Sequence, residues 1–299
     1  MVRAGSAKPA LRRQRKASTA LAGAAFLFGS TFLVVKDAVS EAEPVPFLAV
    51  RFGVAAAVLW PLARRRPGRP GEVHAGLAAG VALGAGYLLQ TAGLQDTSSS
   101  TSAFITYLLV VIVPLLSAVV LRRPPHRVTV VGLALAVAGL ALLTGGGDAG
   151  FGRGEALTLG CAVAFAAHIV VLAQVAPEHD PVRLTFIQLL VVGGGCLLPG
   201  FALGGYQFAG SAWLAAVGLG VCATALAFVL QVWAQARVGP TRTALLLLLE
   251  PVFAAVLGYV AGERLGIGGL AGAVLILAAI VVSEVLGPVL DRRVKITPS

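Results

Sequence analysis

Hydrophobic residues fall into ten long runs, separated by short stretches that hold charged residues, glycine or proline. The runs cover residues 18–38, 45–63, 73–95, 99–121, 127–145, 154–176, 182–203, 211–236, 240–261 and 266–288. A helix needs about 20 mostly apolar residues to cross the hydrocarbon core of a bilayer. The pattern therefore predicts an all-α integral membrane protein with ten transmembrane helices.

Composition and charge placement support a membrane protein and indicate its orientation. Only 12% of the residues are charged, against about 25% in average soluble domains. The net charge of +10 does not indicate nucleic-acid binding, because Lys and Arg stand in short clusters between the runs. With the N-terminus inside the cell, 19 of the 23 Lys and Arg residues fall on the cytoplasmic side. This asymmetry predicts that both termini are cytoplasmic in a multi-pass protein of the inner or plasma membrane, and the Ala-, Gly- and Arg-rich composition favours a bacterial source.

The two halves of the sequence resemble each other. Residues 28–44 align without gaps on residues 165–181, and Pro114 aligns on Pro251 at the same offset of 137. The predicted units are a basic N-terminal tail (1–17), repeat 1 (18–145), a linker (146–153), repeat 2 (154–288) and a C-terminal tail (289–299). Five helices in each repeat make the second repeat inverted relative to the first. Inverted repeats are typical of transporters that bind substrate near the bilayer midplane.

One carboxylate stands within the ninth run, at Glu250, directly before Pro251. Proline removes a helical hydrogen bond and disfavours helical geometry in the preceding residue, so we expect a helix kink at Pro251 and at its repeat partner Pro114. A charge at this depth costs several kcal/mol unless a cavity accommodates it. Repeat 1 has Val113 at the position equivalent to Glu250, so the carboxylate does not follow from the repeat.

Other polar and aromatic residues near the middle of the runs complete the candidate substrate-binding or coupling set. They are Thr31, Tyr87, Gln90, Tyr107, His168, Gln231 and Trp233. Glu250 either binds a proton or a substrate amino group, or is a structural carboxylate at the kink; His168 either relays protons or bonds to a neighbouring helix. The two glutamines contact substrate or clamp their own repeats, and the aromatic residues line a cavity or mark the membrane interface. Arg51 is expected to extend to the outer interface or to pair with Glu41 or Glu43.

The ordered set of motifs resembles the EamA-type branch of the drug/metabolite transporter superfamily. It comprises Phe28–Phe32, Leu48–Phe52, Gly93–Ser98, Ser102–Thr106, Val113–Ser117, Leu249–Ala255 and Gly262–Leu265. The glutamate that usually closes the fourth helix of this family is replaced by the shorter segment Leu121–Pro125. The resemblance implies a substrate cavity lined mainly by the first, third, fourth, sixth, eighth and ninth helices, alternating access, and export.

Together these features predict a secondary transporter of small metabolites, amino acids or drug-like compounds. Motifs for nucleotide binding, zinc-dependent hydrolysis or a serine nucleophile are absent from the sequence, so we expect no enzyme activity, no cofactor and no metal. The expected partners are a small-molecule substrate and the lipid bilayer, without nucleic acid; proton coupling and a homodimer stay open. The alternatives are an intramembrane lipid-modifying enzyme and a membrane subunit that does not transport.

Overall fold

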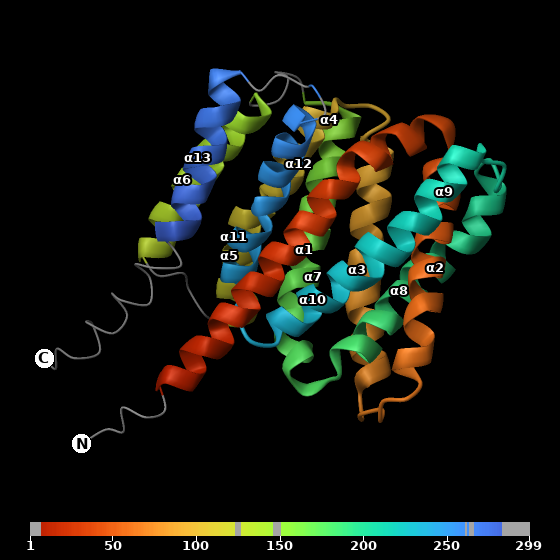
Figure 1. Ribbon diagram of the computed structural model, residues 1–299, viewed down its shortest axis with the longest axis horizontal. Coiled ribbons are helices and arrows are strands. Elements are labelled where there is room, and N and C mark those ends of the chain that lie inside the picture. The colour runs from red at the N-terminus through yellow and green to blue at the C-terminus, as the bar shows by residue number, and fades with distance from the viewer. Residues whose placement is uncertain (1–6, 123–126, 146–150, 261, 263–265, 283–299) are drawn as a thin grey trace, which may run out of the picture.

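The computed structural model describes residues 7–122, 127–145, 151–260, 262 and 266–282. Every regular element within these residues is helical, as the sequence predicted (Figure 1). The elements are α1 (Ala7–Glu41), α2 (Pro44–Ala63), α3 (Glu72–Gly93), α4 (Ser99–Tyr107), α5 (Leu109–Val120), α6 (Arg127–Thr144), α7 (Arg153–Val175), the 3₁₀ helix η1 (Ala176–Glu178), α8 (Pro181–Ala202), α9 (Gly210–Leu219), the π-helix η2 (Gly220–Ala225), α10 (Leu226–Gln235), α11 (Pro240–Leu247), α12 (Leu249–Val260) and α13 (Ile267–Val281).

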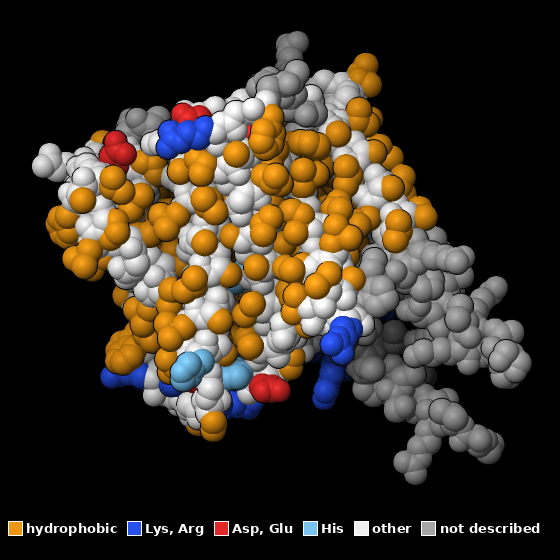
Figure 2. Space-filling view, turned by 180° about the vertical axis from the view of Figure 1, so that it is seen from behind, with side chains coloured by type: hydrophobic (Ala, Val, Ile, Leu, Met, Phe, Trp, Pro, Cys, Tyr) orange, Lys and Arg blue, Asp and Glu red, His pale blue; other side chains and the backbone are white. Residues whose placement is uncertain are grey.

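Among the residues that the structure describes, seven helical segments are long and apolar enough to cross a membrane. They are Pro44–Ala63, Glu72–Gly93, Thr101–Val120, Arg153–Glu178, Pro181–Ala202, Gly210–Gln235 and Pro240–Val260. Two shorter apolar helices, Thr129–Thr144 and Ile267–Val281, accompany them. On the face in Figure 2, hydrophobic side chains cover the middle, and charged side chains gather at the upper and lower edges. This surface is that of a multi-pass membrane protein; the count of ten spans and the cytoplasmic termini stay predictions.

Helices of the two halves pack in a reciprocal pattern. At the repeat offset, α2 corresponds to α8 and α6 to α13, and each of these equivalent pairs is in contact. The contact of α3 with α7 is matched by α1 with α10, and the contact of α5 with α7 by α1 with α12. Reciprocal contacts of this kind arise when two similar units are related by a two-fold axis. The packing thus supports two structurally equivalent halves.

Glycines allow the helices to approach closely. A methyl group on Gly139 of α6 would lie 2.8 Å from the carbonyl oxygen of Gly272 in α13. In α3, Gly80 faces Val191 of α8, where an added Cβ would lie 2.7 Å from the valine Cβ. Lipid supplies no hydrophobic drive between helices, so such close van der Waals packing holds them together.

The two proline-containing segments are each interrupted before the proline. Leu108 separates α4 from α5, and Leu248 separates α11 from α12, with nearly the same backbone angles (φ −59°, ψ −10° and φ −62°, ψ −10°). The breaks lie 140 residues apart, three more than the offset between Pro114 and Pro251. The expectation that Glu250 leaves helical geometry is wrong, because it lies in the first turn of α12. Proline is tolerated in a first turn, where no intrahelical donor is required.

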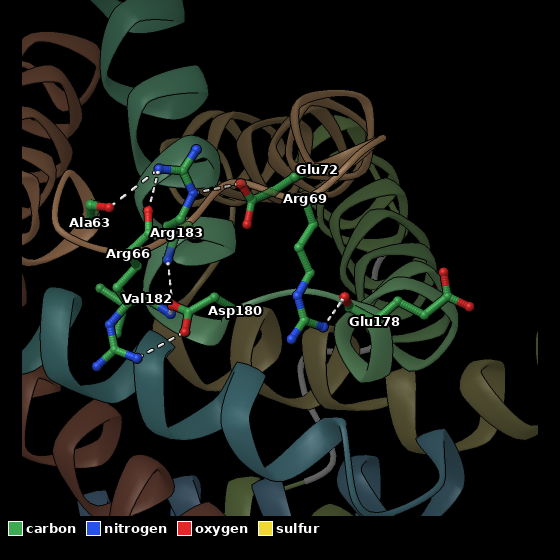
Figure 3. A network of polar contacts seen from close by, with 8 residues as sticks. All are labelled: Ala63, Arg66, Arg69, Glu72, Glu178, Asp180, Val182 and Arg183. Atoms are coloured by element: carbon green, nitrogen blue, oxygen red, sulfur yellow. Dashed lines mark hydrogen bonds and ion pairs between the residues drawn. The ribbon is translucent and has the colours of Figure 1, made fainter.

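A polar network ties the α2–α3 connection to the start of α8 (Figure 3). Arg66 pairs with Asp180 at 2.8 Å, and Arg183 pairs with Glu72 at 2.6 Å. Arg69 donates to the backbone carbonyl of Glu178. The Glu72 side chain is 2% exposed, so its partner is required to offset the cost of burying the charge. The network therefore fixes one end of the bundle, where segments from both halves meet.

Replacing Glu72 by glutamine should destabilise the protein by about 1–2 kcal/mol, because a charge-assisted hydrogen bond becomes a neutral one. Thermal melting in detergent measures the change. Asp96→Asn is the matched control, since its ion pair with Arg153 is exposed (side chains 38% and 78%) and should contribute under about 1 kcal/mol. Equal shifts of the melting temperature in both variants would show that the burial of Glu72 does not increase the contribution of the Glu72–Arg183 ion pair to stability.

Candidate functional site

A small cavity lies between the two halves of the bundle. Its volume is about 100 Å³. Its lining comes from α1, α3, α4 and α5, α7, α10, and α11 and α12, which are the segments named by the family resemblance. The lining residues are Phe28, Leu83, Tyr87, Gln90, Thr106, Tyr107, Leu109, Phe165, His168, Ile169, Phe228, Gln231, Leu247 and Glu250. The structure therefore brings Glu250, His168, Gln90, Gln231, Tyr107 and Tyr87 together; we call this space the central cavity.

Glu250 supplies the only carboxylate among the residues that line the central cavity. The break at Leu248 starts a new helix just before it, so the side chain stands in the first turn of α12. Tyr107 lines the same cavity and interacts with this carboxylate. Carboxylates are favoured near a helix N-terminus, where backbone N–H groups are unpaired. The carboxylate can thus accept a proton or bind a cationic group inside a mostly apolar space.

Backbone packing holds Glu250 in place from the side of α1. An added Cβ on Gly29 would lie 2.6 Å from the Glu250 carbonyl oxygen and 3.1 Å from the Cβ of Phe253. Glycine is therefore the residue that lets α1 reach the α12 backbone at this level.

The two glutamines have different partners. Gln90 Nε2 lies 3.4 Å from Thr106 Oγ1, which links α3 to α4 within the first half. Gln231 donates to Gln235 Oε1 at 3.1 Å, and Gln235 donates to the backbone carbonyl of Ile169 at 3.2 Å. Each glutamine lines the cavity and also forms a hydrogen bond within its own half. The geometry is therefore compatible with both expected roles, contact with substrate and stabilisation of the glutamine's own repeat.

His168 bonds across helices. Its Nε2 lies 2.7 Å from Gln188 Oε1 on α8, and the Gln188 amide donates to the backbone carbonyl of Leu184. The histidine is 2% exposed. This contact matches one of the two roles expected for His168, a hydrogen bond to a neighbouring helix. It also orients the imidazole ring at the cavity wall.

Aromatic rings form much of the cavity wall. Tyr87 meets Phe165 with centroids 5.3 Å apart, and Phe28 meets Phe228 at 5.0 Å. The sequence analysis did not predict that Phe28, Phe165 and Phe228 line a cavity. The repeat alignment held the signal, because Phe28 aligns with Phe165 and Tyr87 with Phe228. Equivalent aromatic positions of two similar halves meet at the interface between them.

Thr31, Trp233 and the two prolines do not line the central cavity. The Thr31 hydroxyl donates to the Phe28 carbonyl of its own helix at 2.7 Å. The Trp233 ring lies under the Arg237 guanidinium, 4.0 Å from the ring centroid. Pro114 and Pro251 are buried within α5 and α12.

The expectation that Arg51 extends to the outer interface is wrong, whereas the Glu41 side chain, one of its two expected partners, lies outside the described residues. It is 4% exposed, its Nε donates to Thr224 Oγ1 of η2 at 2.8 Å, and its guanidinium lies 5.9 Å from the Tyr87 ring centroid. A buried guanidinium must be hydrogen-bonded, and the π-helix η2 presents a hydroxyl where it is needed. Hydropathy could not reveal this, because the partner lies 173 residues away in the sequence.

Comparison with known proteins shows which family and fold this chain is similar to. A sequence model of the EamA-like transporter family matches residues 15–145 and again residues 152–284. Two proteins of Archaeoglobus fulgidus, each named "Uncharacterized transporter", are 32% and 33% identical over 270 and 275 residues. The aligned parts cover 89% and 91% of this chain, and 85% and 97% of those proteins. A crystal structure with 21% sequence identity has the same fold, with a TM-score of 0.79 over 90% of this chain and 98% of that chain.

Proposed function

The chain belongs to the EamA-like transporter family and is a membrane transporter, and we propose that it exports small metabolites, amino acids or drug-like compounds without ATP. The main support for this proposal is the lining of the central cavity. Among its lining residues, Glu250 is the single carboxylate, and it lies among aromatic and amide side chains. Such a site suits an amphiphilic solute with an amino group. The ring faces bind its apolar part, and Glu250 binds the cation or a coupled proton.

The proposed mechanism is alternating access by two inverted five-helix halves, with ten spans and cytoplasmic termini. The reciprocal helix contacts support it, because similar halves can exchange two equivalent arrangements around one site. The cavity volume of about 100 Å³ is below the roughly 300–1,000 Å³ of small-molecule pockets. Substrate entry therefore requires the halves to move apart at one end.

Flux of a panel of labelled amino acids and amphiphilic amines in proteoliposomes tests this function. We expect protein-dependent flux of at least one class, and faster flux when a pH gradient is imposed. Liposomes without protein are the control. Flux that ignores the gradient would contradict proton coupling, and absence of flux across the whole panel would contradict the proposed substrate class.

A further inference from the structure

A second hollow lies next to the central cavity, toward one end of the bundle. Its volume is about 450 Å³, and we call it the inner pocket. Its lining includes Leu121, Ala173, Pro177, Gln235, Arg237 and Gly239. Leu121 ends the fourth hydrophobic run, next to the connection that follows it, and Pro177 and Gly239 belong to the connections after the sixth and eighth runs. The distribution of Lys and Arg predicts that all three connections are cytoplasmic.

The two hollows share two walls. On α7, Ile169 lines the central cavity and Ala173 lines the inner pocket. On α10, Gln231 lines the central cavity and Gln235 lines the inner pocket. Both pairs are four residues apart, which is about 6 Å along a helix at 1.5 Å per residue. The partition between the hollows is therefore about one helical turn thick.

The side chain of Gln235 fills this partition. It accepts a hydrogen bond from Gln231 at 3.1 Å and donates one to the Ile169 carbonyl at 3.2 Å, which joins α10 to α7. The residue is 2% exposed. An apolar residue would close the same gap by packing alone. An amide closes it with hydrogen bonds of about 1 kcal/mol each, and water or a polar solute can replace those bonds when the helices separate.

We propose that the inner pocket is the cytoplasmic vestibule of the transport route and that Gln235 is the gate between it and the central cavity. The proposal rests on the proposed function, because a gate has a role only in a protein that passes solutes. In the closed arrangement of this structure, the amide bridges α7 and α10. When substrate or water enters from the vestibule, the Gln235–Ile169 bond breaks and the two hollows join.

Thiol labelling in oriented membrane vesicles tests the gate without any substrate. Cys161, Cys196 and Cys222 are first replaced by alanine, and a single cysteine is introduced as Ala173→Cys or Ile169→Cys. A membrane-impermeant cationic methanethiosulfonate is applied to the cytoplasmic or the opposite face. We expect Ala173→Cys to react from the cytoplasmic face whether residue 235 is glutamine or alanine. We expect Ile169→Cys to react from that face about 30-fold faster with Gln235→Ala, since two hydrogen bonds of about 1 kcal/mol each are lost.

Two further variants keep the result interpretable. Gln235→Met retains the volume but not the hydrogen bonds, so its labelling rate should fall between those of glutamine and alanine. Gln174→Ala changes an exposed glutamine of the inner pocket and should leave the Ile169→Cys rate unchanged. Equal Ile169→Cys rates with Gln235 and Gln235→Ala would overturn the gate. Failure of Ala173→Cys to react from the cytoplasmic face would overturn the vestibule. Because labelling is independent of flux, either result is separate from failure of the transport assay.

Discussion

Glu250→Gln proteoliposomes should show about 10–100-fold less gradient-dependent flux than the unchanged protein. Glutamine preserves the shape of the side chain but cannot take up a proton or neutralise a cationic substrate. A hydrogen bond to a charged group contributes about 1.5–3 kcal/mol, which converts to this range of affinity. The measurement is initial flux with and without a pH gradient, in parallel with thermal melting of the purified variant.

Two controls separate a functional from a structural carboxylate at this position. Asp96→Asn makes the same chemical change at an exposed ion pair outside the central cavity, and should leave flux unchanged. Glu250→Asp keeps the charge on a shorter side chain and should retain part of the flux. If Glu250→Gln transports normally, Glu250 has no coupling or binding role. If it melts much lower, the structural alternative at the helix break is correct.

Gly29→Ala should lower the melting temperature by about 5 °C and reduce flux by about tenfold. The added methyl group would lie 2.6 Å from the Glu250 carbonyl oxygen, which belongs to helix backbone and cannot rotate away. The helices α1 and α12 must therefore separate, at an overpacking cost of about 1–3 kcal/mol. Flux falls because the same movement displaces the carboxylate from the central cavity.

Gly23→Ala is the matched control on the same helix. The nearest atom to its added methyl group is Leu230 Cδ1 at 4.0 Å, an ordinary contact. Alanine is favoured over glycine inside helices by about 1 kcal/mol, so this variant should melt at the same or a slightly higher temperature and keep its flux. Equal losses in both variants would show that general helix changes, rather than the contact at Glu250, cause the effect.

The predicted runs and the observed helices agree because hydropathy is a local signal. Each run predicts a helix whatever its neighbours are, since a chain in lipid must satisfy its backbone hydrogen bonds within the segment. Glu250 was found for the same reason, because a carboxylate beside a proline in an apolar run is visible without a structure. The repeat offset located Pro114 and Pro251 but not the exact breaks, because Leu108 lies six residues before its proline whereas Leu248 lies three residues before its own.

The partners of buried polar side chains and the residues that line the cavity depend on contacts between segments that are distant in the sequence, which the hydrophobic pattern does not reveal. The amino-acid pattern alone was enough to predict a helical membrane protein of two similar halves, its family, and a carboxylate within the ninth run. The packed structure was needed to show that Arg51 is buried against Thr224, that Thr31 and Trp233 do not line the central cavity, and that Gln231 and Gln235 line two different hollows. The reason is physical: a helix has several faces, and the face that meets a cavity is selected by packing against helices more than a hundred residues away.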